Sequence, residues 1–169
     1  MSLRCASLIV LAALVGFFGN TSEKAMATDV QMFDHPPSAA DLEQVFAPAV
    51  RTIIMTPAQP KAVGIRINFG VNSASLPPDA LPYLHSIGQF LAENPQLHLI
   101  VEGHTDARGS DRYNLALSAR RAKTVRDYMV RTEGVDPQRL SYVGKGRSEP
   151  LTADPYSPEN RRVQFVQGG

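Results

Sequence analysis

The clearest structural pattern in the chain lies in residues 97–121, which read LHLIVEGHTDARGSDRYNLALSARR. The apolar run over residues 97–101 predicts a buried strand, and Gly103 and Gly109 bound a polar loop that follows it directly. A helical pattern then extends over residues 112–131. The inner stripe of this helix consists of Leu117, Ala122, Val125 and Met129. A strand, a loop and a helix in this order are typical of a domain that packs helices against a sheet.

The residues on either side of this stretch alternate between the strand period and the helix period. Ile65, Ile67 and Phe69 alternate with polar residues and predict a first strand. The other expected elements are a helix that opens at Pro77-Pro78-Asp79 and stops at Asn94-Pro95, and strands over residues 140–143 and 162–166. We therefore expect residues 62–169 to form an α+β domain of order βαβαββ, a two-layer sandwich with helices on one face of a mixed four-stranded sheet.

The N-terminal residues have the composition of an export signal. Arg4 precedes an apolar stretch over residues 6–18, and Ala25-Met26-Ala27 has the small-x-small form of a signal peptidase site. The stretch is about thirteen residues long, whereas a helix needs ~20 to cross a bilayer, so a retained anchor is the less favoured alternative. We expect residues 1–27 to be a cleaved signal peptide, which leaves an exported chain without a transmembrane anchor.

Cysteine usage and charge exclude several classes of function. Cys5, the only cysteine, precedes the apolar stretch, whereas a lipid-modified cysteine would follow it. Removal of residues 1–27 leaves equal numbers of basic and acidic side chains. A neutral chain has no general affinity for nucleic acid or for an anionic membrane surface, so neither is expected as a partner.

Residues 28–61 are rich in proline and alanine and predict a tether rather than a domain. Only residues 38–45 resemble a short helix, with Ser38 as its N-cap and Asp41 close behind. This segment is the candidate contact for an envelope protein.

Asp106 and Arg121 are the candidate binding residues. Asp106 lies in a loop just past the end of a strand, where ligand groups are often presented, although an aspartate there can also serve only to organise the turn. Arg121 shares a helix face with Leu117 and Val125, at the edge of the inward stripe. A partly desolvated guanidinium needs an anion, which could be Asp106, a ligand carboxylate or both. Together, the two side chains could hold an ammonium and a carboxylate of one ligand, or form a purely structural pair.

Several ordered motifs resemble the OmpA C-terminal-like domain family. They are Ile67-Asn68-Phe69, Ser75-Leu76, Val101-Glu102-Gly103-His104-Thr105-Asp106, Gly109-Ser110, Tyr113-Asn114, Leu117-Ser118, Arg121-Ala122, Val125, Gly144-Lys145-Gly146, Glu149-Pro150 and Asn160-Arg161-Arg162-Val163. The resemblance covers roughly residues 63–166. The family includes the periplasmic domain of OmpA, the peptidoglycan-associated lipoprotein and the wall-binding half of the flagellar motor stator MotB.

The resemblance implies a ligand. Members of the family hold the meso-diaminopimelate of the peptidoglycan stem peptide through the Asp and the Arg that correspond to Asp106 and Arg121. The carboxylate suits the ammonium group of diaminopimelate, and the guanidinium suits its carboxylate. We therefore expect a periplasmic protein, associated with the outer membrane, that binds peptidoglycan and contributes to envelope integrity or anchors a partner.

Supporting roles fall to residues near these two. Thr105 and the amides of Ala107 and Gly109 could donate to a ligand carboxylate. Asn114 and Leu117 flank the pocket in the family pattern, with a loop hydrogen bond as the alternative role for Asn114. Arg161 and Arg162 could shape the site or bond to loop carbonyls, and we expect at least one of them to be structural.

Enzymatic interpretations find little support. His104 and Asp106 supply two potential metal ligands, but no third follows at a convincing spacing, so no metal or other cofactor is expected. No serine has a positioned histidine and acid beside it, so no catalytic residues are expected either. The alternative is a periplasmic enzyme that acts on peptidoglycan through the same pocket, which would require a nucleophile or an activated water beside the ligand.

Overall fold

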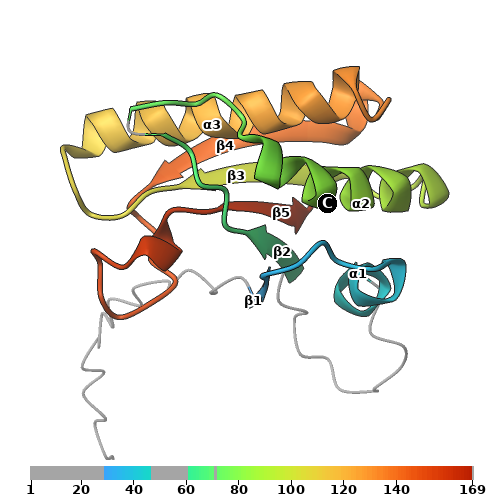
Figure 1. Ribbon diagram of the computed structural model, residues 1–169, viewed down its shortest axis with the longest axis horizontal. Helices are drawn as coiled ribbons and strands as arrows, with labels where there is room; N and C mark the ends of the chain where they lie inside the picture. Colours follow the sequence, from blue (N-terminus) through green and yellow to red (C-terminus); the bar gives the residue numbers. More distant parts are fainter. Residues whose placement is uncertain (1–28, 47–60, 71, 169) are drawn as a thin grey trace, which may run out of the picture.

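A computed structural model describes residues 29–46, 61–70 and 72–168, which form a mixed sheet covered by helices (Figure 1). The sheet has five strands in the order β1-β2-β5-β3-β4. The elements are β1 (Asp29–Phe33), α1 (Ala39–Phe46), β2 (Lys61–Ile65), α2 (Leu81–Glu93), β3 (Leu99–His104), α3 (Asp111–Arg131), β4 (Leu140–Gly146) and β5 (Val163–Gln167), with single 3₁₀ turns at Pro78–Ala80, Pro137–Arg139 and Pro158–Asn160. The fold is α+β, as expected.

The strand directions bring distant loops to one edge of the sheet. β5 is central and runs antiparallel to β2 and β3, while β1 pairs with β2 and β4 with β3 in parallel. Gly103, near the end of β3, pairs with Val163 at the start of β5. The amide of His104 then donates to the carbonyl of Arg162 at 2.9 Å. The loop after β3 and the residues before β5 therefore lie side by side.

One hydrophobic core fills the space between the sheet and the helices. Alternate strand residues face it, and each helix turns one apolar stripe toward it. The fully buried members include Leu42, Val63, Ile65, Leu84, Ile87, Leu91, Leu99, Val101, Ala122, Val125, Met129, Val163 and Phe165. The predicted inner stripe of the second long helix is confirmed, because all four of its residues are buried.

Helix α3 lies unusually close to the sheet above β3 and β4 (Figure 1). A Cβ atom on Gly103 would lie 2.2 Å from the carbonyl oxygen of Ser118, and one on Gly144 would lie 2.5 Å from the amide nitrogen of Ala119. Ser118 is fully buried, and its Oγ accepts a hydrogen bond of 2.9 Å from the amide of Gly146. Two glycines and one small serine thus fix the distance between α3 and the ends of both strands.

The N-terminal end of α3 is set by its own sequence. Ser110 is the N-cap, and its hydroxyl accepts from the amide of Tyr113 at 3.3 Å, while Asp111 complements the helix dipole in the first turn. Gly109 has a φ of +87°, a conformation that glycine adopts without strain, and lets the loop turn into this cap.

Among the described residues, no helix is both long and apolar enough to span a membrane.

Two details of the predicted fold are wrong. The sheet has five strands rather than four. The first predicted strand, over residues 65–69, ends at Ile65. This residue pairs with Val163, the first residue of β5, so the strand has no β5 partner beyond it. Ile67 is still buried while its neighbours Arg66 and Asn68 are exposed, which explains why the alternation resembled a strand.

The segment assigned to the tether contributes to the folded unit where the structure describes it. Residues 29–33 form β1 on the edge of the sheet, and the predicted short helix is present as α1. Leu42, Val45 and Phe46 of α1 are buried in the common core. The expected signal peptide, residues 1–27, and residues 47–60 of the expected tether lie outside the described residues.

Gly103→Ala should lower the stability of the protein by about 1–3 kcal/mol or more, because the new methyl group would collide with the backbone of α3. Gly168→Ala is the matched control, since its Cβ would lie 3.4 Å from the nearest atom. Thermal unfolding of both variants measures the difference. Equal melting temperatures would contradict the proposed role of the close helix contact.

Candidate functional site

A cavity of about 400 Å³ opens where β3 ends, between the loop over residues 104–109, the first half of α3 and the segment that follows β2. Six of the nine predicted site residues line it: Thr105, Asp106, Asn114, Leu117, Arg121 and Arg161. Because Gly103 and Ser118 bring α3 against the strand, side chains eight to sixteen residues apart along the chain share one wall. Ala107, Gly109 and Arg162 are not among the lining residues.

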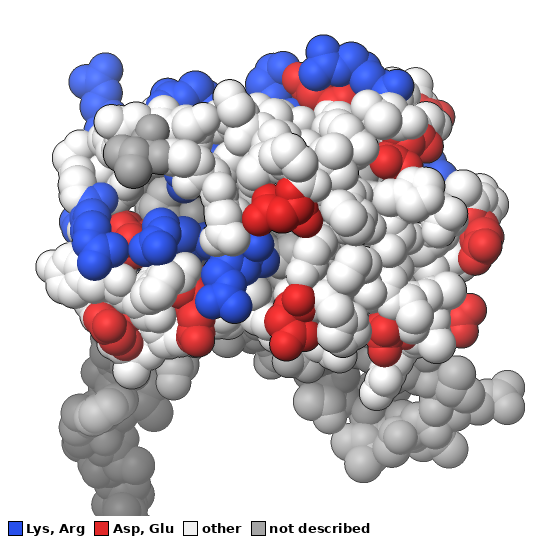
Figure 2. Space-filling view, viewed as in Figure 1, with Lys and Arg blue, Asp and Glu red and all other residues white. Residues whose placement is uncertain are grey.

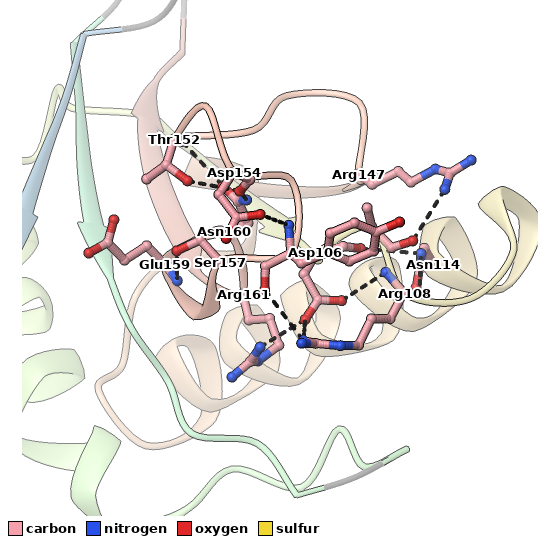
Figure 3. Close-up of polar contacts among 12 residues, drawn as sticks. Asp106, Arg108, Asn114, Arg147, Thr152, Asp154, Ser157, Glu159, Asn160 and Arg161 are labelled. Carbon is pink, nitrogen blue, oxygen red and sulfur yellow. Dashed lines mark hydrogen bonds and ion pairs between the residues drawn. The ribbon is translucent and has the colours of Figure 1, made fainter.

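The carboxylate of Asp106 is buried and held by two arginines (Figure 3). Its Oδ2 accepts from Arg108 Nη1 at 2.7 Å and from Arg161 Nη1 at 2.8 Å, and its Oδ1 accepts from the amide of Arg108 at 3.1 Å. Burial acts to raise the pKa of Asp106, but the hydrogen bonds from Arg161 and Arg108 outweigh it and hold the pKa below its ordinary value. Asp106 is therefore a stable anion that also organises its own loop.

The guanidinium of Arg121 is buried without an ion pair among the described residues. Its Nε donates to the carbonyl of Ser73 at 3.0 Å, and its Nη2 donates to the carbonyl of Gly70 at 3.3 Å. The guanidinium carbon lies 4.8 Å from the centre of the Phe69 ring. Burial lowers the pKa of Arg121, which remains a cation at neutral pH. Carbonyl dipoles and an aromatic face stabilise this charge only in part.

The structural pair that the sequence left open is not formed. Asp106 pairs with Arg108 and Arg161, and within the described residues neither hydrogen bond nor ion pair joins Asp106 to Arg121. Both side chains nevertheless line the same cavity. A carboxylate and a guanidinium thus face one space separately, as a zwitterionic ligand would require.

Other predicted residues shape the loop. Asn114 is buried, and its Nδ2 donates to the carbonyl of Arg108 at 2.8 Å, which is the loop-ordering role left open by the sequence. The expectation that the amide of Ala107 serves a ligand is wrong, because that amide donates to the carbonyl of Pro155 at 2.8 Å. Thr105 lines the cavity and keeps a buried hydroxyl without a hydrogen-bond partner among the described residues.

The two adjacent arginines before β5 have different roles. Arg161 points to Asp106, whereas Arg162 is buried and donates from Nε to Gln164 Oε1 at 2.9 Å and from Nη2 to the carbonyl of Glu149. Burial lowers the pKa of Arg162 to about 10. Arg162 is therefore the structural member of the pair. Asn160, which precedes both, closes the loop: its side chain accepts from the amide of Leu151 at 2.7 Å and donates to the carbonyl of Asp154 at 2.9 Å, and Figure 3 shows it beside Asp154.

The sequence analysis missed five residues of the lining: Phe69, Gly70, Asn72, Arg108 and Tyr113. Phe69 and Gly70 belong to an irregular segment, and the alternating pattern assigned Phe69 to a strand. Arg108 could have been found, because an arginine two residues after a loop aspartate is well placed to bond with its carboxylate. Nothing in the sequence marked Asn72, which accepts from the hydroxyl of Tyr113 at 2.5 Å.

A second polar cluster lies on the opposite face of the sheet. Ligand atoms of Glu102, His104 and Glu149 lie within 4.8 Å of one another, a spacing that could suit a metal ion. Lys145 Nζ, however, lies 3.3 Å from Glu102 Oε1 and 2.9 Å from Glu149 Oε1. The ammonium of Lys145 and the nearby guanidinium of Arg162 together balance the charges of the two carboxylates. This donor set therefore does not suit a metal ion.

Comparison with known proteins identifies the family. A profile of the OmpA family matches residues 68–164, which is more than half of the chain. The chain belongs to the OmpA family. The match extends from the segment after β2 to β5 and so includes every element around the cavity.

Two relatives show how far the OmpA-family likeness extends. A peptidoglycan-associated lipoprotein of Rhizobium meliloti is 42% identical over 110 residues, which cover 63% of this chain and 62% of that protein. This chain thus aligns with less than two thirds of the length of that relative. A protein of the same name from Mesorhizobium japonicum is 35% identical over 169 residues, which cover 96% of this chain and 91% of that protein.

Solved structures agree with the OmpA-family fold. The peptidoglycan-associated lipoprotein from Burkholderia pseudomallei is 30% identical, with a TM-score of 0.55 over 62% of this chain and 89% of that one. The periplasmic domain of Helicobacter pylori MotB (residues 90–256) is 21% identical, with a TM-score of 0.57 over 67% of this chain and 76% of that one. The second likeness is evidence of the fold alone.

Stability should fall as the pH is lowered from about 7.5 to about 5.5, because His104 is buried in the folded protein. Burial lowers the pKa of His104 below its ordinary 6.5, so the unfolded chain takes up the proton first. The contribution of His104 to stability is therefore complete at pH values above its pKa in the unfolded chain, and it is lost as the pH falls below that pKa. Urea unfolding at several pH values should show a flatter profile for His104→Gln, while His98→Gln, at an exposed site, keeps the wild-type slope. Equal slopes for wild type and His104→Gln would refute this assignment.

Proposed function

We propose that this OmpA-family chain binds peptidoglycan noncovalently by gripping the meso-diaminopimelate of the stem peptide. The observation that carries the proposal is that a buried carboxylate, Asp106, and a buried guanidinium, Arg121, line one cavity without pairing with each other. Relatives that carry the name peptidoglycan-associated lipoprotein support the same polymer as ligand.

The chemistry of the ligand matches the cavity group by group. The far end of diaminopimelate carries an ammonium and a carboxylate on one carbon. Asp106, held ionised by its arginine partners, accepts from the ammonium, and Arg121 donates to the carboxylate. The free hydroxyl of Thr105 supplies one further polar contact, and Leu117 packs against the methylene groups.

The biological role follows from wall binding. The protein works in the periplasm at the outer membrane, where it contributes to envelope integrity or anchors an envelope partner. Residues 28–61 are the proposed contact for that partner. Binding without catalysis is favoured over an enzymatic role. His104, the histidine nearest to the site in sequence, belongs instead to the cluster with Glu102 on the opposite face of the sheet.

Asp106→Ala and Arg121→Ala should each weaken binding to insoluble diaminopimelate-type peptidoglycan by about ten- to a hundredfold, since each removes a charge-assisted contact worth about 1.5–3 kcal/mol. Cosedimentation with purified sacculi measures the loss, and thermal unfolding shows that each variant is folded. Asp111→Ala and Arg120→Ala are matched controls, because both side chains are exposed and neither lines the cavity. Wild-type sedimentation of both site variants would refute the site.

Peptidoglycan with lysine at the third stem position should bind more weakly than diaminopimelate-type peptidoglycan by about tenfold or more, because lysine keeps the ammonium but lacks the terminal carboxylate. Arg121→Ala should bind the two walls equally, since it no longer reads that carboxylate. Parallel sedimentation on both kinds of sacculi makes the comparison. A wild-type protein that does not distinguish the walls would show that Arg121 binds something else.

A further inference from the structure

A second cavity, here called the arginine cavity, adjoins the first. Its volume is about 420 Å³, and it shares Phe69, Arg121 and Arg161 with the cavity that holds Asp106. Arg66 and Pro158 line its outer part. The two cavities therefore share Arg121 and Arg161 on their walls, and a sufficiently long ligand could occupy both.

The residues that line the arginine cavity carry positive charge and no negative charge. Arg66, Arg121 and Arg161 belong to it, whereas Asp106 lines only the first cavity. Asp34 and Glu159 lie along a separate depression that also contacts Arg66. Among the described residues, neither forms an ion pair with Arg66.

This concentration of charge is local. The whole chain has a net charge of only +1, yet four arginines, Arg66, Arg108, Arg121 and Arg161, and one carboxylate, that of Asp106, line the two adjoining cavities. Figure 2 shows several basic side chains clustered at the left of the view, with acidic side chains beside and below them and further basic side chains along the upper edge. Such a field attracts anions from solution.

The charges are also incompletely compensated. Burial lowers the pKa of Arg121, and the neighbouring charge of Arg161 acts in the same direction. Arg161 has one carboxylate contact, to Asp106, which Arg108 shares. An anion in the arginine cavity would relieve the mutual repulsion of three cations, and the planar fork of arginine matches the two oxygens of a carboxylate.

We infer that the arginine cavity binds a second carboxylate of the same stem peptide, outside the group held by Asp106 and Arg121. This inference rests on the proposed function. Two carboxylates of the peptide have the required chemistry. One is the α-carboxylate of the glutamate that precedes diaminopimelate, which is free because this residue is linked through its side chain. The other is the C-terminal carboxylate of the residue that follows diaminopimelate.

The test uses three synthetic tetrapeptides of sequence L-Ala, γ-linked D-Glu, meso-diaminopimelate and D-Ala. One is unmodified, one is amidated at the glutamate α-carboxylate and one is amidated at the C-terminus. Isothermal titration of the wild-type protein should show a loss of about three- to tenfold for one amidated peptide, as expected for a half-exposed charge pair. The amidated peptide that binds more weakly than the unmodified one identifies the carboxylate that the arginine cavity holds.

Arg66→Gln should weaken binding of the unmodified peptide by the same factor and abolish the preference over the amidated one. Arg112→Gln, which removes an exposed arginine outside both cavities, should behave as wild type. No effect of either amidation, or a preference that survives Arg66→Gln, would overturn the inference.

Arg121→Ala separates this inference from the proposed function. If Arg121→Ala loses affinity for all three peptides while amidation has no effect on the wild type, the diaminopimelate site stands and only the second carboxylate site fails. If the wild-type protein binds no peptide better than Arg121→Ala does, both fail.

Discussion

The close approach of α3 to the ends of β3 and β4 is the constraint on which the site depends. Gly103 and Gly144 leave no room for side chains between helix and sheet, and Ser118 bonds across the gap to the amide of Gly146. The helix therefore presents Arg121 to the same cavity as the loop that carries Asp106. A methyl group at either glycine would push the two functional groups apart as well as strain the core.

Electrostatic interactions give the two functional groups of the site different roles. The loop carboxylate is held in its ionised form by Arg108 and Arg161, so it is fixed in position before a ligand arrives. The helix guanidinium, by contrast, is bonded to the carbonyls of Ser73 and Gly70 and retains the need for an anion. This division of roles suits a ligand that carries an ammonium and a carboxylate at one end.

Periodicity predicted the long helices, because each turns one apolar stripe to the core, and it predicted β3 and β5, whose alternate residues Leu99, Val101, Val163 and Phe165 lie in that core. It failed at β2, where Ile67 stays buried after the ladder has ended, and it did not identify β1, an edge strand in the proline-rich segment that was assigned to a tether. The motifs around Asp106 and Arg121 predicted which residues share a cavity. They could not predict that Arg161 would pair with Asp106, because that contact spans 55 residues of chain and depends on the closure of a loop by Asn160.

We propose that Asp106 and Arg121 together hold the free end of diaminopimelate. The most direct measurement is an NMR titration of isotope-labelled protein with meso-diaminopimelate, followed through the backbone amides and the arginine Nε–H groups. The largest shifts are expected at the Nε–H of Arg121 and at the amides around Asp106, with Nα-acetyl-L-lysine amide, which keeps only the side-chain ammonium, producing much smaller changes. Saturable shifts confined to another surface, or none at all, would contradict it.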